Sequence, residues 1–231
     1  MARERVVLHR DMREVAYSPE RFEVLASKRA RSSNYLEALP PGTRVFGSLA
    51  RGDVRPASDI DVEVPFGSAS FAVEVALSRL ANPWNDRRLV QATPNSVVKA
   101  LWIFGEVTVA LAITRPNPTE EDFARFGGAV DREQLRRNDR VPGVDKRLLL
   151  IEPTQRGHRE SSVADRVEDA AKVLGIAPDV IRGRVRVLKR RSETGRTGVY
   201  LSRAVRDDQN TEEVLDELKD ADPAVRRAAS G

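Results

Sequence analysis

The alternation of apolar and acidic residues is most regular in residues 59–64, where Ile60, Val62 and Val64 separate the acids. Successive side chains of a β-strand point to opposite faces, so this pattern predicts a strand with one apolar and one acidic face. The acidic positions are Asp59, Asp61 and Glu63. We expect the apolar face to pack in a core and the carboxylates to point away from it.

Other apolar runs predict further strands and one hairpin. Residues 97–104 and 107–114 flank Gly105-Glu106, a turn composition typical of a β-hairpin. Trp102 is expected in the core or on the sheet face. The remaining strands are predicted at residues 5–9, 43–46, 58–65, 89–92 and 146–151.

Helical periodicity and capping residues predict helices between these strands. Ser18 and Pro19 suit the N-cap and the first position of a helix, and Pro40 marks its end. Phe22 and Leu25 give that helix an apolar face. Further helices are predicted at residues 68–81, 119–127, 131–139, 161–174 and 180–191. Strands that alternate with helices indicate an α/β protein.

The Val-Pro-Gly composition of residues 141–143 is typical of a turn between domains. We therefore expect a first domain at residues 1–140, a basic C-terminal helical module at residues 141–206 and an acidic tail at residues 207–231. The chain has 231 residues, 40% hydrophobic and 32% charged, which is enough for one sizeable core and a smaller one.

Composition excludes several classes of site. The chain has no cysteine, so it has no disulfide, no thiolate metal site and no cysteine nucleophile. No apolar run approaches the length of a transmembrane helix, and the first residues lack the apolar segment of a signal peptide. We therefore expect a cytoplasmic protein without a membrane partner. The net charge of +4 permits an acidic partner without requiring one.

The aspartates of residues 59–64 suggest a metal site. Two like charges on one strand face repel each other, which costs stability unless a cation lies between them. Carboxylate oxygens suit Mg²⁺ or Mn²⁺, and Mg²⁺ is commonly held by one or two carboxylates together with substrate phosphates. The alternative is that Asp59 and Asp61 lie on a solvated strand edge and bind nothing.

A Gly-Ser pair precedes this strand. Gly47 lets a phosphate approach the backbone, and Ser48 offers a hydroxyl at a helix start whose N–H groups favour an anion. Arg51 is a further candidate for a phosphate contact, with a surface ion pair to Asp53 as the alternative. A phosphate cradle followed by a metal site suits the transfer of a nucleotidyl or phosphoryl group from a triphosphate.

The run FGSLARGD at residues 46–53, followed by SDIDV at residues 58–62, closely resembles the signature of the minimal nucleotidyltransferases of the DNA polymerase β superfamily. The resemblance is specific over residues 43–65 and extends by strand order to about residue 115. It implies the nucleotidyltransferase fold, with one mixed, mostly antiparallel sheet flanked by helices.

The resemblance also implies roles for individual residues. Gly47 and Ser48 would hold a nucleoside triphosphate, which is the implied substrate. Asp59 and Asp61 would bind two Mg²⁺ (or Mn²⁺) ions and act as the catalytic residues.

Members of this family carry a third carboxylate on a later strand, and the present chain departs from that pattern. Counting from Gly105 places the position at Val109, which is not an acid. Glu106 lies out of register in the hairpin, and Glu63, a substitute, would lie further along the first strand. The third acid normally helps to hold the catalytic metal and to activate the attacking hydroxyl. Its loss would leave binding of metal and nucleotide possible through Asp59 and Asp61 while weakening the chemistry.

The C-terminal module has the residue spacing of a helix-turn-helix. Ala171 suits the helix contact, Gly175 the turn and Ile181 the aliphatic anchor, although Arg184 occupies a position that is usually apolar. In this interpretation residues 180–191 form the recognition helix.

Positive charge accumulates in the same region. Between residues 182 and 206, nine basic residues stand against a single acid, Glu193. Such a stripe is a candidate contact for the phosphate backbone of a nucleic acid. The candidate contact residues are Arg182, Arg186, Lys189, Arg190 and Arg191. The alternative is a solvated basic helix that the acidic tail neutralises.

The sequence supports three functional hypotheses. The first is a metal-dependent nucleotidyltransferase that moves a nucleoside monophosphate from a triphosphate to a hydroxyl of RNA, a protein or a small molecule. The second is a regulator that binds nucleotide and nucleic acid through a catalytically weakened nucleotidyltransferase fold. The third is an antitoxin-like partner of a helical toxin protein, which the family resemblance alone suggests.

Overall fold

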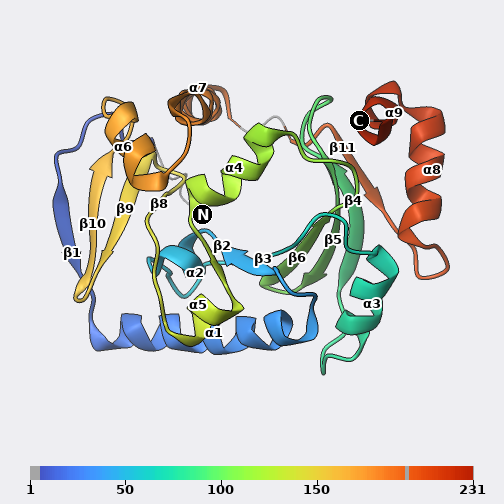
Figure 1. Cartoon of the computed structure of the whole chain (residues 1–231), viewed down its shortest axis with the longest axis horizontal. Coiled ribbons are helices and arrows are strands. Elements are labelled where there is room, and N and C mark those ends of the chain that lie inside the picture. The colour runs from blue at the N-terminus through green and yellow to red at the C-terminus, as the bar shows by residue number, and fades with distance from the viewer. Residues whose placement is uncertain (1–5, 196–197, 231) are drawn as a thin grey trace. The chain divides into compact units, whose positions relative to one another are not determined.

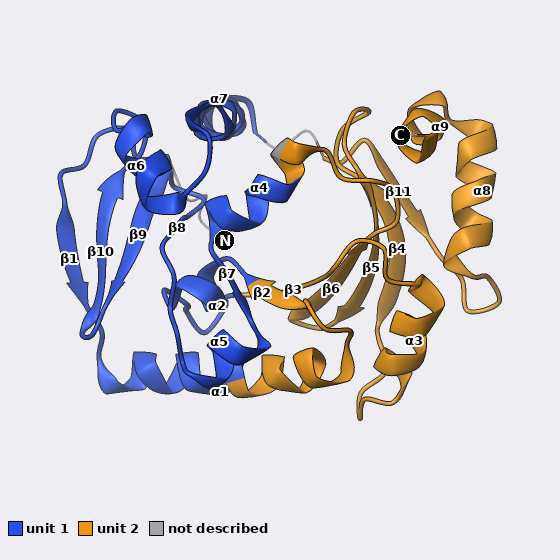
Figure 2. Cartoon of the chain, in the orientation of Figure 1, with its two compact units in different colours: residues 1–29, 46–58, 121–197 blue, residues 30–45, 59–120, 198–231 orange. Residues whose placement is uncertain are grey.

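The computed structural model describes residues 6–195 and 198–230 (Figure 1). The chain divides into two compact units, each assembled from three separate segments (Figure 2). Unit 1 comprises residues 1–29, 46–58 and 121–197, and unit 2 comprises residues 30–45, 59–120 and 198–231. The functional division at residues 140 and 206 stays a prediction, because a compact unit need not be a functional domain. None of the described helices combines the length and the apolar character that crossing a bilayer requires.

Unit 2 is built on one mixed sheet. Its strands are β2 (Arg44–Phe46), β3 (Ile60–Val64), β4 (Asp86–Gln91), β5 (Val98–Phe104), β6 (Val107–Ala112) and β11 (Leu201–Ala204). They lie in the order β11-β4-β5-β6-β3-β2. The β3–β6 pair is parallel, whereas β6–β5, β5–β4 and β4–β11 are antiparallel. This confirms the mixed, mostly antiparallel sheet and the hairpin around Gly105-Glu106.

One face of this sheet is a packed core. Val62 and Trp102 both pair with Val109, so their side chains project to the same side of the sheet. Both are fully buried there. Helix α1 (Pro19–Ala38) reaches this face through Tyr35, whose ring packs edge-on against Phe104. The other helices of unit 2 are α3 (Ser70–Ser78), α8 (Thr211–Ala221) and α9 (Pro223–Ser230).

The residues predicted as an acidic tail are folded into unit 2 as α8 and α9. The Thr211 hydroxyl lies 3.0 Å from Glu74 of α3, within hydrogen-bond distance. Arg87 of β4 donates to the carbonyls of Arg206 (2.6 Å) and Gln209 (2.7 Å). These contacts tie the segment to the sheet and to α3 within unit 2, while its functional separation as an acidic tail stays a prediction.

Unit 1 contains an antiparallel sheet in the order β1-β10-β9-β8. Its strands are β1 (Arg13–Ala16), β8 (Gly143–Val144), β9 (Leu149–Thr154) and β10 (Gly157–Ser162), with the short β7 (Ala129–Asp131) in addition. Its helices are α2 (Ser48–Arg51), α4 (Pro118–Gly127), α5 (Arg132–Arg136), α6 (Val167–Leu174) and α7 (Pro178–Thr194). The apolar core joins β9 to α6 and α7 through residues such as Leu150, Leu174 and Ile181.

The two helices and the turn that the spacing of residues 171–181 predicts are present as α6 and α7, while their assignment as a helix-turn-helix module stays a prediction. Gly175 ends α6 with φ 62° and ψ 37°, a left-handed conformation that favours glycine. Ala171 and Ile181, the small and aliphatic positions of the pattern, are both buried in the unit 1 core. The pattern therefore predicted the local fold correctly, while nucleic-acid binding stays a prediction.

Two predicted elements are wrong. A strand was expected at residues 5–9, but described residues 6–9 have no regular structure, and the strand lies further on as β1; residue 5 is outside the described residues. A helix was expected from Ser161 or Ser162, but both residues end β10. The Ser162 hydroxyl donates to the carbonyl of Leu8 at 2.7 Å. This long-range contact uses the hydroxyl that the sequence suggested as a helix cap.

Candidate functional site

The carboxylates of residues 59–64 lie on one face of β3, in unit 2. Asp59 immediately precedes β3 and is exposed, whereas Asp61 and Glu63 lie within the strand and are half-buried. The residues between them are fully buried: Ile60, Val62 and Val64. The predicted alternation is therefore confirmed, and we call Asp59, Asp61 and Glu63 the acidic face of β3.

Glu63 is already neutralised by cations of unit 2. Its Oε2 lies 3.1 Å from Arg44 Nη2, and its Oε1 lies 3.1 Å from Lys99 Nζ. A carboxylate held between two cations is a poor ligand for a further divalent ion, because the cations would have to be displaced or would repel it. Glu63 is therefore not suited to replace the missing third carboxylate. Asp59, in contrast, has no hydrogen bond or ion pair within the described part of the chain.

The parallel register of β3 and β6 decides which residue of β6 faces the aspartates. Asp61 lies opposite Thr108, and Val62 lies opposite Val109. Because paired residues project to the same side of a sheet, Thr108 shares the acidic face, whereas Val109 is fully buried in the core. Val109, the position reached by counting from Gly105, therefore does not face the aspartates, whereas Thr108 does.

Glu106 is not placed to supply that carboxylate either. It lies in the turn between β5 and β6 and forms an ion pair with Arg31 of α1. The β6 strand itself contains no acidic residue. The side chain that faces Asp61 from β6 is thus a neutral hydroxyl.

The Gly-Ser turn lies in unit 1, where it connects β2 to α2. Gly47 adopts φ 75° and ψ −141°, a conformation that glycine alone adopts readily. Its backbone N–H donates to the carbonyl of Gly128 at 2.9 Å, so this N–H is already used within the protein. Ser48 begins α2 and is half-buried.

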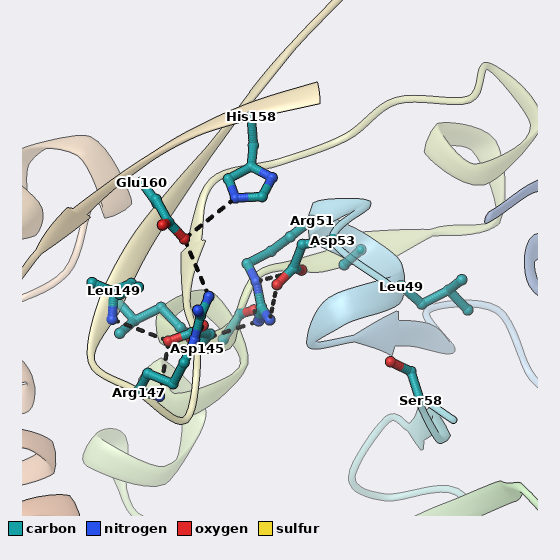
Figure 3. A network of polar contacts seen from close by, with 12 residues as sticks. Leu49, Arg51, Asp53, Ser58, Asp145, Arg147, Leu149, His158 and Glu160 are labelled. Atoms are coloured by element: carbon teal, nitrogen blue, oxygen red, sulfur yellow. Dashed lines mark hydrogen bonds and ion pairs between the residues drawn. The ribbon is translucent and has the colours of Figure 1, made fainter. Parts of the chain in front are cut away.

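Arg51 is buried and bound by groups of the protein. Its side chain makes a two-point contact with Asp53, at 3.0 Å from Nε to Oδ1 and 3.1 Å from Nη2 to Oδ2 (Figure 3). Its Nη1 donates to the carbonyls of Gly127 (2.6 Å) and Val144 (3.4 Å). The ion pair with Asp53 is therefore buried and not on the surface, and this geometry favours a structural role for Arg51. Its contact with nucleotide stays a prediction.

Three cations of α1 bind the loop that contains the motif, a feature that the sequence analysis missed. Arg21 donates to the carbonyl of Asp53 at 3.2 Å, and Lys28 donates to that of Ser58 at 2.8 Å. Arg29 donates to Leu49 O at 3.1 Å and to Asp139 O at 2.7 Å. The signal in the sequence was the spacing of these cations. Lys28 and Arg29 follow Arg21 by seven and eight residues, which is about two helical turns and places all three on one side of the helix.

Two of these cations, Lys28 and Arg29, are buried, which is energetically costly. Burial, reinforced by the neighbouring charge of Arg140, lowers the pKa of Arg29 to about 10. A buried cation is retained only where its hydrogen bonds are satisfied. Carbonyl groups of Leu49, Ala50 and Ser58 in the motif loop accept hydrogen bonds from Lys28 and Arg29, so these cations connect the loop to α1 within unit 1.

Beside this loop lies a buried group of titratable side chains. The Tyr17 hydroxyl and His158 Nδ1 form a hydrogen bond of 2.7 Å, and His158 Nε2 lies 3.6 Å from Glu160 (Figure 3 shows the last pair). Burial raises the pKa of Tyr17 to about 12. Although burial opposes the ionisation of Glu160, the guanidinium groups of Arg147 and Arg10 outweigh it and lower the pKa of that carboxyl. Tyr17 and Glu160 therefore keep their ordinary charges at neutral pH.

His158 makes the stability of the protein depend on pH. Burial lowers the pKa of His158 below its ordinary value of about 6.5. Just below that pH, the unfolded chain therefore binds a proton that the folded protein does not. Stability is therefore expected to fall as pH decreases through about 6.5. Urea unfolding at a series of pH values should show a smaller fall for His158→Gln. His9→Gln is the control, because His9 is the only other histidine and is exposed. An unchanged slope for His158→Gln would contradict the assignment.

The basic residues of α7 that were predicted to contact a nucleic acid differ in whether they form ion pairs. Arg182 forms ion pairs with Glu168 and with Asp179, at 2.8 Å in the latter pair. The other candidates have no ion pair within residues 6–195 and 198–230: Arg186, Lys189, Arg190 and Arg191.

Within the same described ranges, no group of three or more histidine or acidic side chains is arranged to hold a metal ion.

Comparison with known proteins supports the resemblance drawn from the motif. Residues 36–105 match the family model of the nucleotidyltransferase domain. The match extends from the end of α1 to the β5–β6 turn and stops before β6. It confirms the family resemblance over that region and indicates a nucleotidyltransferase activity in general terms. No curated protein and no solved structure matches the chain.

Proposed function

We propose, from the nucleotidyltransferase domain at residues 36–105, that the protein transfers a nucleoside monophosphate from a triphosphate to a hydroxyl acceptor with the help of a divalent metal. The observation that carries this proposal is the acidic face of β3. There, Asp61 lies on the side of the strand that faces away from the core, and the exposed Asp59 directly precedes the strand, two positions earlier in the alternation.

Asp59 and Asp61 are suited to bind a hard divalent cation through their carboxylate oxygens. Asp59 is exposed and has no partner within the described residues, and Asp61 lies two positions further along the same face. Two carboxylates together with substrate phosphates are a usual ligand set for Mg²⁺ or Mn²⁺. When bound, the metal would neutralise the charge that develops on the transferred and leaving phosphates.

The remaining roles belong to the chain itself. We assign the phosphate contact to Gly47 and the Ser48 hydroxyl, as the sequence motif predicts. Arg21, Lys28 and Arg29 would act as positioning residues, because their bonds to backbone carbonyls fix the motif loop in unit 1. Thr108 stands where a carboxylate would accept the proton of the attacking hydroxyl, so we expect slow turnover.

The effect of a carboxylate at position 108 is a direct test. Thr108→Asp is expected to increase pyrophosphate release by about tenfold or more, because general-base catalysis typically contributes 10²–10⁴-fold. Thr108→Asn has the same shape without the charge and should leave the rate unchanged. Val109→Asp should instead destabilise the fold, since it buries a charge in the core of unit 2. A rate increase with Thr108→Asn would contradict the proposed role of the charge.

The lack of a third carboxylate beside Asp61 favours a second candidate function, a protein that binds nucleotide without catalysis. With Thr108 on β6 and Glu63 bound by Arg44 and Lys99, the fold could bind a triphosphate without turning it over. Such a protein would act as a nucleotide-binding regulator. It would show triphosphate binding by calorimetry but no pyrophosphate release, whereas the enzyme would show both.

A further inference from the structure

The outward face of α7 in unit 1 is strongly basic. Val180, Ile181 and Val185 point into the apolar core, which fixes the rotation of the helix about its axis. With 3.6 residues per turn, the opposite side of the helix carries Arg182, Arg186 and Arg190, with Lys189 at its edge. Arg191 falls on the side of Val180 and Arg184. Helices α6 and α7 are joined by the Gly175 turn and drawn beside each other in Figure 1.

Not all of the positive charge on α7 is available to a partner. Arg182 is occupied by Glu168 and Asp179. Arg184 lies over the rings of Phe123 and Phe126 of α4, with its guanidinium carbon 4.9 and 5.7 Å from the ring centroids. These two arginines are therefore engaged within unit 1.

Four further cations of α7 have no ion pair among the described residues, and three of them share one side of the helix. Arg186, Arg190 and Arg191 are exposed and Lys189 is half-buried. None of these four side chains forms an ion pair with any described residue. Arg186, Lys189 and Arg190 lie at positions i, i+3 and i+4 of the helix, and we call these three residues the basic face of α7. Like charges at these spacings repel one another, so an anionic partner would stabilise this surface.

We propose that the basic face of α7 binds the phosphodiester backbone of a nucleic acid duplex. This inference goes beyond the proposed nucleotidyl transfer and does not depend on it. Arg186 and Arg190 are separated by about 6 Å along the helix, whereas phosphates repeat about every 3.4 Å per strand along the axis of B-form DNA. Each cation can therefore meet a different phosphate, and arginine forms two hydrogen bonds with phosphate oxygens.

The helix-turn-helix arrangement favours a duplex over a single strand. A helix with an exposed basic face fits the wide major groove of B-form DNA, whereas the major groove of duplex RNA is too deep and narrow. No aromatic side chain lies on α7, and such side chains are what single-strand binders use to stack bases. Duplex DNA is therefore the expected ligand, and duplex RNA shares its backbone chemistry.

The test compares two triple variants of the full chain that carry the same net charge. Arg186→Gln/Lys189→Gln/Arg190→Gln removes the three charges of the basic face. The matched control, Arg13→Gln/Arg79→Gln/Arg156→Gln, removes three exposed arginines elsewhere. In both variants the net charge falls from +4 to +1, because +4 − 3 = +1. Fluorescence anisotropy with labelled duplex DNA, duplex RNA and single-stranded DNA, over a range of salt concentrations, gives the affinities.

The wild type and the control should bind duplex DNA with an affinity that falls as salt increases. For the α7 variant we expect at least about tenfold weaker binding near 0.1 M salt and a log–log salt slope shallower by about 2.7. Should the triple variant be unstable, Arg190→Gln alone should make the slope shallower by about 0.9. Equal binding by wild type and α7 variant would overturn the proposal. So would equal losses in both variants, or binding to anionic phospholipid vesicles without binding to nucleic acid.

Discussion

The double variant Asp59→Asn/Asp61→Asn is expected to lose nucleotidyl transfer, with pyrophosphate release falling at least about 10³-fold. Both substitutions keep the size of the side chain and remove the charge that would hold the divalent ion. Because Asp59 is exposed and Asp61 half-buried, the fold should tolerate the change. The measurement is pyrophosphate release with Mg²⁺ and each of the labelled triphosphates, and chelation of the metal should have the same effect.

A matched control is available on the same sheet. Asp86 on β4 is half-buried and projects to the same side as Asp61, through the register Asp61–Thr108–Ile103–Asp86. Asp86→Asn therefore makes the same chemical change on the same surface and should leave turnover near that of the wild type. Pyrophosphate release that survives in the double variant would refute a metal site at the acidic face of β3.

Replacing Arg51 by methionine is expected to destabilise the protein by about 3–5 kcal/mol. The substitution removes the two-point contact with Asp53 and leaves a largely buried carboxylate without its cation. It also removes hydrogen bonds to the carbonyls of Gly127 and Val144. Urea unfolding of wild type and variant measures the loss.

Two further variants separate this role from nucleotide binding. Arg51→Met/Asp53→Asn should recover part of the lost stability, because it no longer buries an unpaired charge. Arg88→Met disrupts the more exposed pair with Asp86 and should cost only about 0–1 kcal/mol. If Arg51→Met unfolds like the wild type yet binds triphosphate more weakly, Arg51 contacts the nucleotide and the structural assignment is wrong.

The sequence was sufficient for those features that depend on short-range patterns. Alternation identified β3 and placed Asp59 and Asp61 on one face, since strand geometry has a period of two residues. Turn composition identified the hairpin at Gly105, and capping residues identified the start of α1. The spacing of Ala171, Gly175 and Ile181 predicted the α6–α7 pair for the same reason.

Pairings between distant segments were beyond these patterns. The register of β3 with β6 showed that Thr108, and not Val109, faces Asp61, because a shift of one residue moves a side chain to the other face of a sheet. The pairing of Glu63 with Arg44 and Lys99 also depends on three strands coming together.

For the charged residues, too, some features follow from the sequence and others only from the tertiary structure. Their number and position along the chain follow from the sequence, which indicated a basic helix at residues 180–191. Only the tertiary structure decided which cations are engaged: Arg51 is buried with Asp53, and Arg182 is paired with Glu168, whereas Arg190 has no ion pair among the described residues. The reason is physical, because the partner of a charge is chosen by distance in space and by burial, and neither quantity is local in sequence.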